Sequence, residues 1–341
     1  LMHNNFMFGA SSTIGRRPQN EDAHIIANVN GVQLAGVYDG HGGYSCSSFI
    51  QQNLVQTLQS FQNFEQNLPK FISQTYIQLD KNYIKQEGST DIFNSAGSTA
   101  CTLMIQQNKL YFANVGDSRA ICGKWHGGIA ELANEKLSKQ LLQQLTQQIT
   151  VDHKPNNPTE KARIESYGSC VTENNDDCPR VAGMLAVARA IGDAPFKGCG
   201  VISHPEIFSL DASELDWVVI ACDGLYDVMS NEEVNLVIQV AKNAEKGLKT
   251  EVENDQRLQI IKNAVLEFLK SENLNDEFSK NAEKELAKLT EQQYFESESK
   301  DVKVQGKIKD KFAPENIARI LCKMAVGLMS EDNVSVVVGL K

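Results

Sequence analysis

Short runs of apolar residues, most of them followed by a turn-forming or acidic residue, set the pattern of this chain. Residues 32–38, VQLAGVY, and 217–222, WVVIAC, are almost wholly apolar, and each is followed by an Asp-Gly pair. Runs of this length and composition are typical of buried strands. Gln107-Asn108 separates two further apolar runs, which predicts a hairpin. In all, the pattern predicts strands over residues 32–38, 99–106, 109–113, 120–122, 217–222 and 334–340.

Other segments repeat their apolar residues at helical spacing, as Leu68, Ile72 and Tyr76 do. Strands that alternate with such helices fit a parallel α/β sheet. The hairpin and the closely spaced strands favour antiparallel sheets with flanking helices, and the pattern alone leaves both architectures open. The spacing predicts helices over residues 45–60, 64–84, 132–149 (a Gln-rich segment) and 159–167.

The composition changes between residues 241 and 312, where Lys, Glu, Asn and Gln dominate. Apolar residues still recur there, from Leu258 to Leu269, so we predict a solvated helical excursion rather than a second catalytic domain. Two interpretations stay open: a helical hairpin of no catalytic importance, or a docking arm that selects substrates or partners. We predict one domain over residues 1–341, with helical insertions at about 132–149 and 241–312.

Acidic residues stand beside most of the predicted strand ends. A single Asp there is ordinarily a turn residue or a helix cap. Several carboxylates that converge would raise each other's pKa at a cost in stability, and bound cations would remove that cost. Oxygen-only ligands favour Mg²⁺ or Mn²⁺ over Zn²⁺. The acids concerned are Glu21, Asp22, Asp39, Asp117, Asp223, Asp227 and Asp332.

The net charge of the chain indicates which substrates it can bind. The 341 residues carry a net charge of −10, which disfavours nucleic acid as a partner. A phosphate ester meets the same objection unless cations reverse the local sign. Two cations about 3.5–4 Å apart can bind the oxygens of such an ester and share a water that attacks phosphorus in line. Arg16 or Arg17 could then anchor the phosphate, and His41 could protonate the leaving oxygen.

Other phosphatase chemistries need signatures that the sequence lacks. None of the eight cysteines has an Arg six positions later, as a thiol-based phosphatase requires, and there is no Asp-x-Asp pair for a phosphoaspartate mechanism. Gly116-Asp117 and Gly192-Asp193 lack the following His-Gly of the two-metal phosphatases with His-rich sites.

The cysteines and the N-terminus give information on where in the cell the protein is located. No Cys pair has C-x-x-C spacing, so we expect reduced thiols and a cytoplasmic or nuclear location. No apolar run reaches the roughly 18 residues of a transmembrane helix. Residue 1 is Leu rather than Met, so an N-terminal lipid site stays open. The oligomeric state is not predicted.

Several segments, taken in order, resemble the PP2C family of metal-dependent (PPM) phosphatases. They span about residues 9–240 and 314–341. The departures from the family pattern, at Ser169, Ala188, Tyr226 and Met329, remove no expected metal ligand. The matching segments are GRRPQNEDAH, VYDGHGG, AGSTA, LYFANVGDSRAI, DHKPNNPTEKARIESYGSCV, RVAGMLAVARAIGD, VVIACDGLYDVMSNEEV and EDNVSVVVG.

This resemblance implies an α+β fold, a four-layer αββα sandwich of two packed antiparallel sheets flanked by helices. It also implies two Mg²⁺ or Mn²⁺ ions and phosphoserine or phosphothreonine proteins as substrates. Asp39 would bridge both ions. Glu21 and the Gly40 carbonyl would help hold one ion, and Asp223 and Asp332 the other.

The resemblance assigns further roles around this centre. Arg17 fits the phosphate-binding arginine better than Arg16, and His41 fits the general acid. A weaker third ion would fall on Asp152, Asp223 and Asp227. Other matched residues look structural: Asp117, Ser118 and Arg119 would tie strands together, and Arg189 and Asp193 would brace the sheet near the site.

Two other functions remain possible on the sequence. One is a catalytically silent binding module of the same fold, which would be expected to have lost a metal ligand, whereas all five positions are intact. The other is a phosphatase of small phosphoesters or nucleotides, although the G-x-x-x-x-G-K-[ST] loop is absent.

Overall fold

The chain forms two compact units in the computed structural model, each with its own sheet and helices. The first unit contains residues 21–120 and 149–212, and the second contains residues 6–20, 121–148 and 213–341, as far as they are described. The structure describes residues 6–88, 91, 95–126, 136–173, 178–270, 279–290 and 312–341.

A five-stranded sheet of order β13-β7-β6-β3-β2 forms the centre of the first unit. All of its neighbouring strands run antiparallel, which excludes the parallel alternative for this sheet. Asn30 and Gly31 connect β2 to β3 with φ angles of 51° and 79°, both positive as in the two-residue turns that suit hairpins. The strands are β2 (Ala23–Val29), β3 (Val32–Tyr38), β6 (Ala100–Gln106), β7 (Lys109–Val115) and β13 (Glu206–Asp211).

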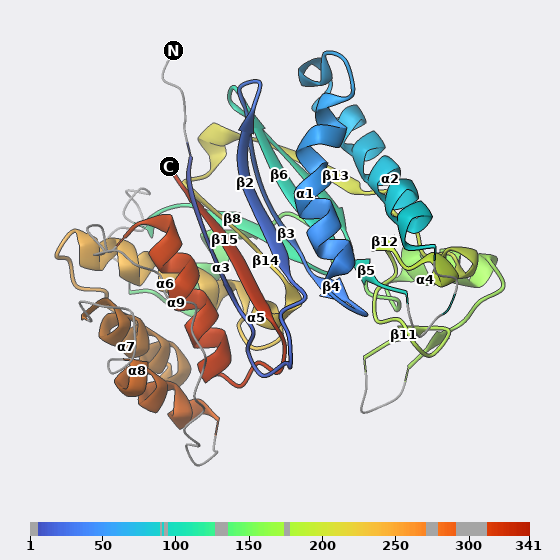
Figure 1. The fold of residues 1–341 in the computed structure, drawn as a ribbon. Coiled ribbons are helices and arrows are strands. Elements are labelled where there is room, and N and C mark those ends of the chain that lie inside the picture. The colour runs from blue at the N-terminus through green and yellow to red at the C-terminus, as the bar shows by residue number, and fades with distance from the viewer. Residues whose placement is uncertain are drawn as a thin grey trace. The chain divides into compact units, whose positions relative to one another are not determined.

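Helices α1 (Ser45–Gln59) and α2 (Leu68–Glu87) pack on this sheet (Figure 1). Ile50 of α1 and Tyr76 of α2 share one apolar core with Leu34 of β3. This core fixes β3, whose last residue, Tyr38, directly precedes Asp39. The sheet therefore holds a candidate site residue at the end of a buried strand.

Short elements complete the first unit. A three-stranded sheet of order β12-β5-β4 joins segments far apart in the chain. The short elements are β4 (Gly40–His41), η1 (Phe64–Gln66), β5 (Gly97–Ser98), α4 (Pro158–Ser166), β10 (Val171–Thr172), β11 (Arg180–Val181), β12 (Ile191–Gly192) and η3 (Ala194–Cys199).

The second unit contains a five-stranded sheet of order β1-β15-β14-β8-β9. The central strand pairs in this sheet, β1 with β15 and β15 with β14, are antiparallel, as is β8 with β9. Helices α6 and α9 bury apolar residues in one core with β14 and β15. The strands are β1 (Met7–Thr13), β8 (Arg119–Gly123), β9 (Thr146–Gln148), β14 (Trp217–Ala221) and β15 (Val334–Leu340). The helices are α3 (Lys139–Gln144), η4 (Ala212–Glu214), α5 (Asp223–Tyr226), α6 (Asn231–Glu245), α7 (Gln256–Lys270), α8 (Ser279–Leu286), η5 (Ala287–Leu289) and α9 (Pro314–Gly327).

These elements confirm the predicted α+β class and the predicted strands, but the prediction of one helix over residues 132–149 is wrong. The described helix covers only Lys139–Gln144, after Ser138 accepts a hydrogen bond from Leu141 N–H as an N-cap. Thr146–Gln148 instead form β9, which pairs antiparallel with β8. Backbone pairing with β8 therefore outweighs the helical preference of the Gln-rich sequence. Residues 132–135 lie outside the described part.

The prediction of a solvated excursion at 241–312 is also wrong for its first helix. Leu258, Ile261 and Val265 of α7 are fully buried in the core of the second unit. The helical character is confirmed for α7 and α8, while residues 271–278 and 291–311 lie outside the described part. α7 therefore belongs to the core of the second unit, and a docking role for residues 241–312 stays a prediction.

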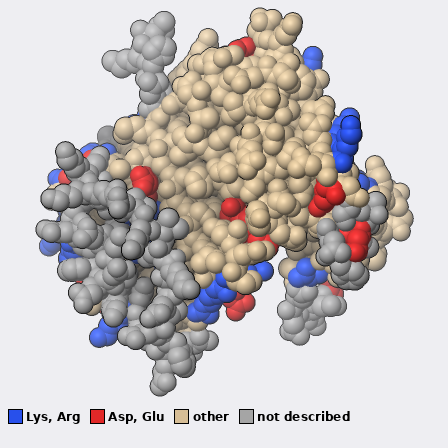
Figure 2. Space-filling model, in the orientation of Figure 1, with Lys and Arg blue, Asp and Glu red and all other residues tan. Residues whose placement is uncertain are grey.

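The surface carries charges of both signs. On the face drawn in Figure 2, Lys and Arg side chains and Asp and Glu side chains lie dispersed among uncharged residues. Among the helices that the structure describes, none is long and apolar enough to cross a membrane.

Candidate metal centre

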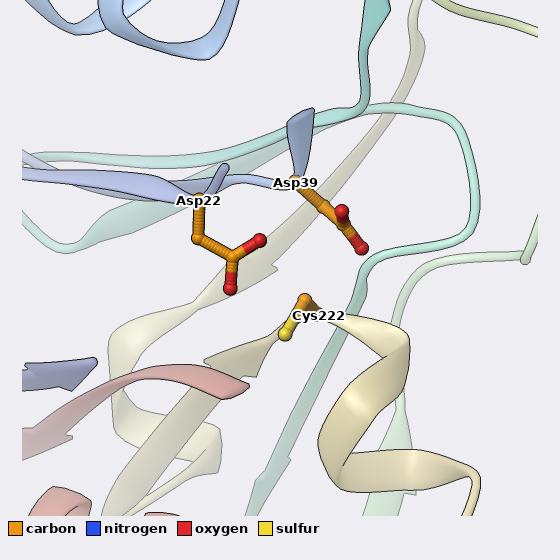
Figure 3. Close-up of side chains that lie close together, drawn as sticks. All are labelled: Asp22, Asp39 and Cys222. Carbon is orange, nitrogen blue, oxygen red and sulfur yellow. The ribbon is translucent and has the colours of Figure 1, made fainter. Parts of the chain in front are cut away.

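Asp22 and Asp39 lie opposite each other where the β2–β3 ladder ends. Ala23 pairs with Tyr38 in the antiparallel register, so the next positions outward are Asp22 and Asp39. Their carboxylates present oxygen atoms within 4.8 Å of each other (Figure 3). Two carboxylates this close repel each other, and a divalent cation offers the compensating charge. Carboxylate oxygens such as these suit Mg²⁺ or Mn²⁺.

The backbone of Asp39 is fixed by the AGSTA segment. Asp39 N–H donates to Thr99 Oγ1 over 3.0 Å, and Thr99 N–H donates to Asp39 O over 2.8 Å. The Thr99 hydroxyl also hydrogen-bonds the hydroxyl of Ser118 over 2.7 Å, in the buried interior. Thr99 therefore fixes the backbone from which the predicted bridging carboxylate of Asp39 extends, a role that its sequence position alone does not reveal.

Glu21 is held next to Gly40 by close backbone packing. A Cβ at position 40 would lie 2.3 Å from the Glu21 carbonyl oxygen, so only glycine fits there. Glu21 Oε2 accepts a hydrogen bond from Gly43 N–H over 3.2 Å, and the Ser47 hydroxyl donates to the Glu21 carbonyl. The structure therefore brings the predicted ligands Glu21, Asp39 and Gly40 to one place in the first unit.

His41 lies immediately beyond these residues and bonds to a buried acid. Its Nε2 lies 2.7 Å from Oδ2 of Asp193, whose side chain is only 2% exposed. Burial alone would lower the pKa of His41, but the carboxylates of Asp193, Asp117 and Glu21 outweigh it and raise that pKa above its ordinary value. A raised pKa suits a group that must hold a proton until it protonates a leaving oxygen.

Two further acids, Asp223 and Asp332, lie in the second unit, just after β14 and just before β15. Ala221 of β14 pairs with Val336 of β15, and both acids lie just beyond the paired residues. A Cβ at Gly224 would lie 2.1 Å from the Asn333 carbonyl oxygen, which shows how closely the two segments approach. Asp223 begins α5, and Asp332 precedes β15.

The loop that carries Asp332 is tied to the segment before β2. The Asn333 side-chain amide donates to the carbonyls of Ile14 and Gln19, over 2.8 and 3.0 Å. Its backbone N–H donates to Asp332 Oδ1 over 2.7 Å, so Asn333 orients Asp332 through the main chain.

Of the two candidate arginines, only Arg17 contacts a predicted ligand. Its Nη2 donates to Asp332 Oδ2 over 2.7 Å, and its Nε donates to the Glu331 carbonyl over 3.3 Å. Arg16 is directed to the sulfur of Met329 instead. The phosphate-binding role of Arg17 stays a prediction.

Cys222 lies where β14 ends and α5 begins (Figure 3). Its thiol accepts from Ser335 N–H over 3.1 Å and donates to the Asn333 carbonyl over 3.4 Å. These bonds stabilise the β14–β15 pair, so Cys222 has a structural role in the second unit.

The residues predicted for a third ion are engaged in protein contacts. Asp152 accepts two hydrogen bonds from Arg119, over 3.1 and 2.6 Å. Asp227 follows Asp223 by one helical turn, and its N–H donates to the Asp223 carbonyl over 2.8 Å. A cation on Asp152 would have to share that carboxylate with Arg119, and the third ion stays a prediction.

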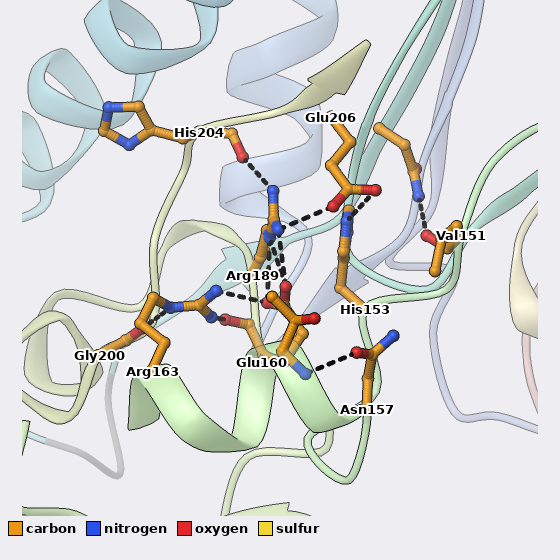
Figure 4. A network of polar contacts seen from close by, with 12 residues as sticks. Val151, His153, Asn157, Glu160, Arg163, Arg189, Gly200, His204 and Glu206 are labelled. Atoms are coloured by element: carbon orange, nitrogen blue, oxygen red, sulfur yellow. Dashed lines mark hydrogen bonds and ion pairs between the residues drawn. The ribbon is translucent and has the colours of Figure 1, made fainter. Parts of the chain in front are cut away.

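A buried ionic network near α4 braces the first unit (Figure 4). Arg189 donates to both carboxylate oxygens of Glu160 and reaches Glu206 over 3.1 Å. Arg163 contacts Glu160 over 2.7 Å, and His153 Nε2 lies 3.5 Å from Glu206. Because the arginines neutralise these carboxylates, we interpret the cluster as structural rather than as a metal site.

Comparison with known proteins identifies the family. A family model described as protein phosphatase 2C matches residues 6–276. The chain belongs to this family. Four of the five predicted metal-binding positions, Glu21, Asp39, Gly40 and Asp223, lie within the matched residues, and Asp332 lies beyond them.

Two PP2C relatives come from Arabidopsis thaliana. Probable protein phosphatase 2C 11 is 35% identical over 244 residues, which cover 70% of this chain and 60% of that protein. Probable protein phosphatase 2C 59 is 36% identical over 249 residues, which cover 72% and 73% of the two chains. The chain therefore spans less than two thirds of the length of the first of these relatives.

Solved structures share the fold. Serine-threonine phosphatase 2C from Toxoplasma gondii has a TM-score of 0.66 at 18% identity, over 100% of this chain and 96% of that one. A sex determining protein of C. elegans also reaches 0.66 at 20% identity, over 99% of this chain and 65% of that one. At this identity the likeness concerns the fold alone.

Proposed function

We propose that this PP2C protein hydrolyses phosphoserine and phosphothreonine in protein substrates and needs two Mg²⁺ or Mn²⁺ ions to do so. The observation that carries the proposal is the presence of acids at strand ends. Asp22 and Asp39 present carboxylate oxygens within 4.8 Å of each other, and the segments that carry Asp223 and Asp332 pack closely just after β14 and just before β15. Such acids fit oxygen-coordinated divalent ions. Family membership supports the same reaction class.

Asp39 would contact both ions in this proposal. Glu21 and the Gly40 carbonyl would complete the binding of one ion, and Asp223 and Asp332 that of the other. When bound, such ions supply charge neutralisation for the phosphate and a water of lowered pKa.

Two side chains of the protein would bind the phosphate and protonate the leaving oxygen. The Arg17 guanidinium is 54% exposed and can hold two phosphate oxygens at once. The His41 side chain is 30% exposed and can give a proton to the departing serine or threonine oxygen. Together they bind the substrate and stabilise the leaving group.

One set of assays distinguishes the proposed function from two alternatives, a phosphatase of small phosphoesters and a catalytically silent binding module. The protein is incubated with a phosphothreonine peptide, nucleotides and sugar phosphates, in Mn²⁺ or Mg²⁺ and with or without EDTA. We expect metal-dependent release of phosphate that is fastest with the peptide. Faster release from a nucleotide or sugar phosphate would indicate a small-molecule phosphatase. Peptide binding without any release at millimolar metal would indicate a silent binding module.

A further inference from the structure

The contact between His41 and Asp193 joins two residues that are 152 positions apart in the chain. A small sheet brings them together. In its register His41 pairs with Gly97, Gly97 pairs with Gly192, and Asp193 follows Gly192 directly. The three short strands therefore place an acid beside the histidine at the edge of the candidate site.

Asp193 is held in a conformation that is unfavourable for a residue with a side chain. Its φ angle is 52°, in the left-handed region. Asp193 N–H donates to the Ala96 carbonyl over 3.1 Å, and Gly192 N–H donates to Asp80 Oδ1 over 2.8 Å. Lys197 in turn contacts Asp80 over 3.0 Å. Such strain, of about 1–3 kcal/mol, persists only where the surroundings over-determine the backbone, and it is common at functional sites.

Gly97 leaves room for the contact. A Cβ at this position would lie 2.2 Å from Asp193 Oδ2 and 2.5 Å from His41 Nε2, which are the two atoms of the hydrogen bond. No residue other than glycine fits there without breaking the bond. The middle strand, β5, therefore needs glycine at this position to accommodate the hydrogen bond between His41 and Asp193.

The hydrogen bond between His41 and Asp193 determines which ring nitrogen of His41 can donate a proton to a substrate. Nε2 faces the buried Asp193 carboxylate, and among the described residues nothing hydrogen-bonds to Nδ1. A carboxylate on one ring nitrogen fixes the tautomer and the orientation of the other. Nδ1 is thus the nitrogen available to a substrate.

We propose that Asp193 is a positioning residue that holds His41 through Nε2 so that Nδ1–H faces the leaving oxygen. The proposal rests on the proposed phosphatase activity. As water forms a bond to phosphorus, the bond from phosphorus to the serine or threonine oxygen breaks. That oxygen takes the proton from His41 Nδ1, and the imidazolium becomes a neutral imidazole that still donates from Nε2–H to Asp193. The proton lost by the attacking water passes to solvent, and His41 recovers one from solvent.

Substrates with different leaving groups test this role. A phosphothreonine peptide has an alkoxide leaving group that needs a proton, whereas p-nitrophenyl phosphate has a stable phenolate that does not. For Asp193→Asn we expect kcat on the peptide to fall about 10- to 100-fold, as for partners that orient a catalytic histidine. We expect kcat on p-nitrophenyl phosphate to fall less than about threefold and KM to stay within about twofold on both substrates, because proton donation alone is impaired.

A double variant and a spectroscopic measurement complete the test. His41→Ala combined with Asp193→Asn should be no slower on the peptide than His41→Ala alone. Nitrogen-15 chemical shifts of His41 should show Nε2 protonated in the unaltered protein and a changed tautomer in Asp193→Asn, a result that does not depend on turnover. Equal loss of kcat on both substrates, additive losses in the double variant or unchanged His41 shifts would each overturn the proposal.

The outcomes separate this inference from the proposed function. An unaltered protein that releases no phosphate from either substrate contradicts the phosphatase proposal itself. An active unaltered protein whose Asp193→Asn variant keeps full peptide activity contradicts only the role of Asp193. If Asp193→Asn does not fold, as judged by circular dichroism, Asp193→Glu provides the same comparison, because a longer carboxylate displaces the imidazole while keeping the charge.

Discussion

The guanidinium of Arg17 donates to Oδ2 of Asp332 over 2.7 Å, so the expected phosphate-binding cation and an expected metal ligand share one ion pair. Both side chains are partly exposed, at 54% and 36%. An exposed pair of this kind contributes at most about 1 kcal/mol to stability. We therefore expect this pair to matter for binding rather than for folding.

Replacing Arg17 should separate substrate binding from metal binding. For Arg17→Ala we expect KM for a phosphothreonine peptide to rise at least about tenfold, because a charged hydrogen-bonding partner of the phosphate is lost at a cost of about 1.5–3 kcal/mol. Mn²⁺ should bind slightly more tightly, because Asp332 no longer pairs with a cation. Steady-state kinetics and calorimetric titration with Mn²⁺ measure both effects. Weaker Mn²⁺ binding together with an unchanged KM would contradict this account of Arg17.

Gly97 offers a test of the packing around His41. Gly97→Ala places a Cβ within 2.5 Å of both atoms of the His41–Asp193 bond, and we expect a loss of about 1–3 kcal/mol in the free energy of unfolding. Gly198→Ala is the matched control, because a Cβ there meets nothing within 4 Å. Urea unfolding of both variants measures the difference. Equal stability of the two would mean that the packing at Gly97 is looser than the structure shows.

Met329 occupies a backbone conformation that favours glycine. Its φ is 72°, one residue after α9 ends in its C-cap Leu328. Helices commonly end on a left-handed glycine at this position. Met329→Gly should therefore raise the free energy of unfolding by about 0.5–1 kcal/mol. Met329→Ala, which keeps the Cβ, should not raise it. Urea unfolding measures the free energies of unfolding of both variants. A Met329→Gly variant that is less stable than the unaltered protein would rule out strain at this residue.

The network around Glu160 predicts a dependence of stability on pH. Burial would raise the pKa of Glu160, but hydrogen bonds and charge from Arg189 and Arg163 outweigh it and lower that pKa below its ordinary 4.5. The folded state therefore gains stability from ionised Glu160 above about pH 4.5, and this gain is lost as the pH falls through the lowered value. We expect Glu160→Gln to cost about 3–5 kcal/mol at pH 7, because it removes the buried carboxylate that neutralises Arg189.

Urea unfolding between pH 7 and pH 3 checks the Glu160 prediction. Glu160→Gln should lose less stability on acidification than the unaltered protein, whereas Glu165→Gln, an exposed neighbour on α4, should behave like the unaltered protein. Identical pH dependence for Glu160→Gln and the unaltered protein would show that Glu160 does not carry the effect.

Local patterns predicted much of the fold. Residues 32–38 and 334–340 are apolar runs between turn signals, and β3 and β15 have these bounds. The β2 strand was not predicted, although Asn30-Gly31 is the strongest short signal for a hairpin turn. With that turn, the register alone would have placed Asp22 opposite Asp39.

The remaining features depend on contacts between distant segments. Gln147 lies in a Gln-rich run of helical character, yet it pairs with Cys122 in a strand. Leu258 lies in a polar region, yet it is fully buried. The bond between His41 and Asp193 depends on a sheet built from three parts of the chain. The local sequence does not specify which distant segment each of these residues contacts, so only the folded structure reveals those contacts.

The most direct test of the two-metal phosphatase account is phosphate release from a phosphothreonine peptide as Mn²⁺ is titrated into metal-free protein. The account predicts no release in EDTA, recovery at millimolar Mn²⁺, a loss of at least about 100-fold in Asp39→Asn, and no change in the control Glu165→Gln. Release that persists in EDTA, or that Asp39→Asn retains at the same Mn²⁺ concentration, would contradict it.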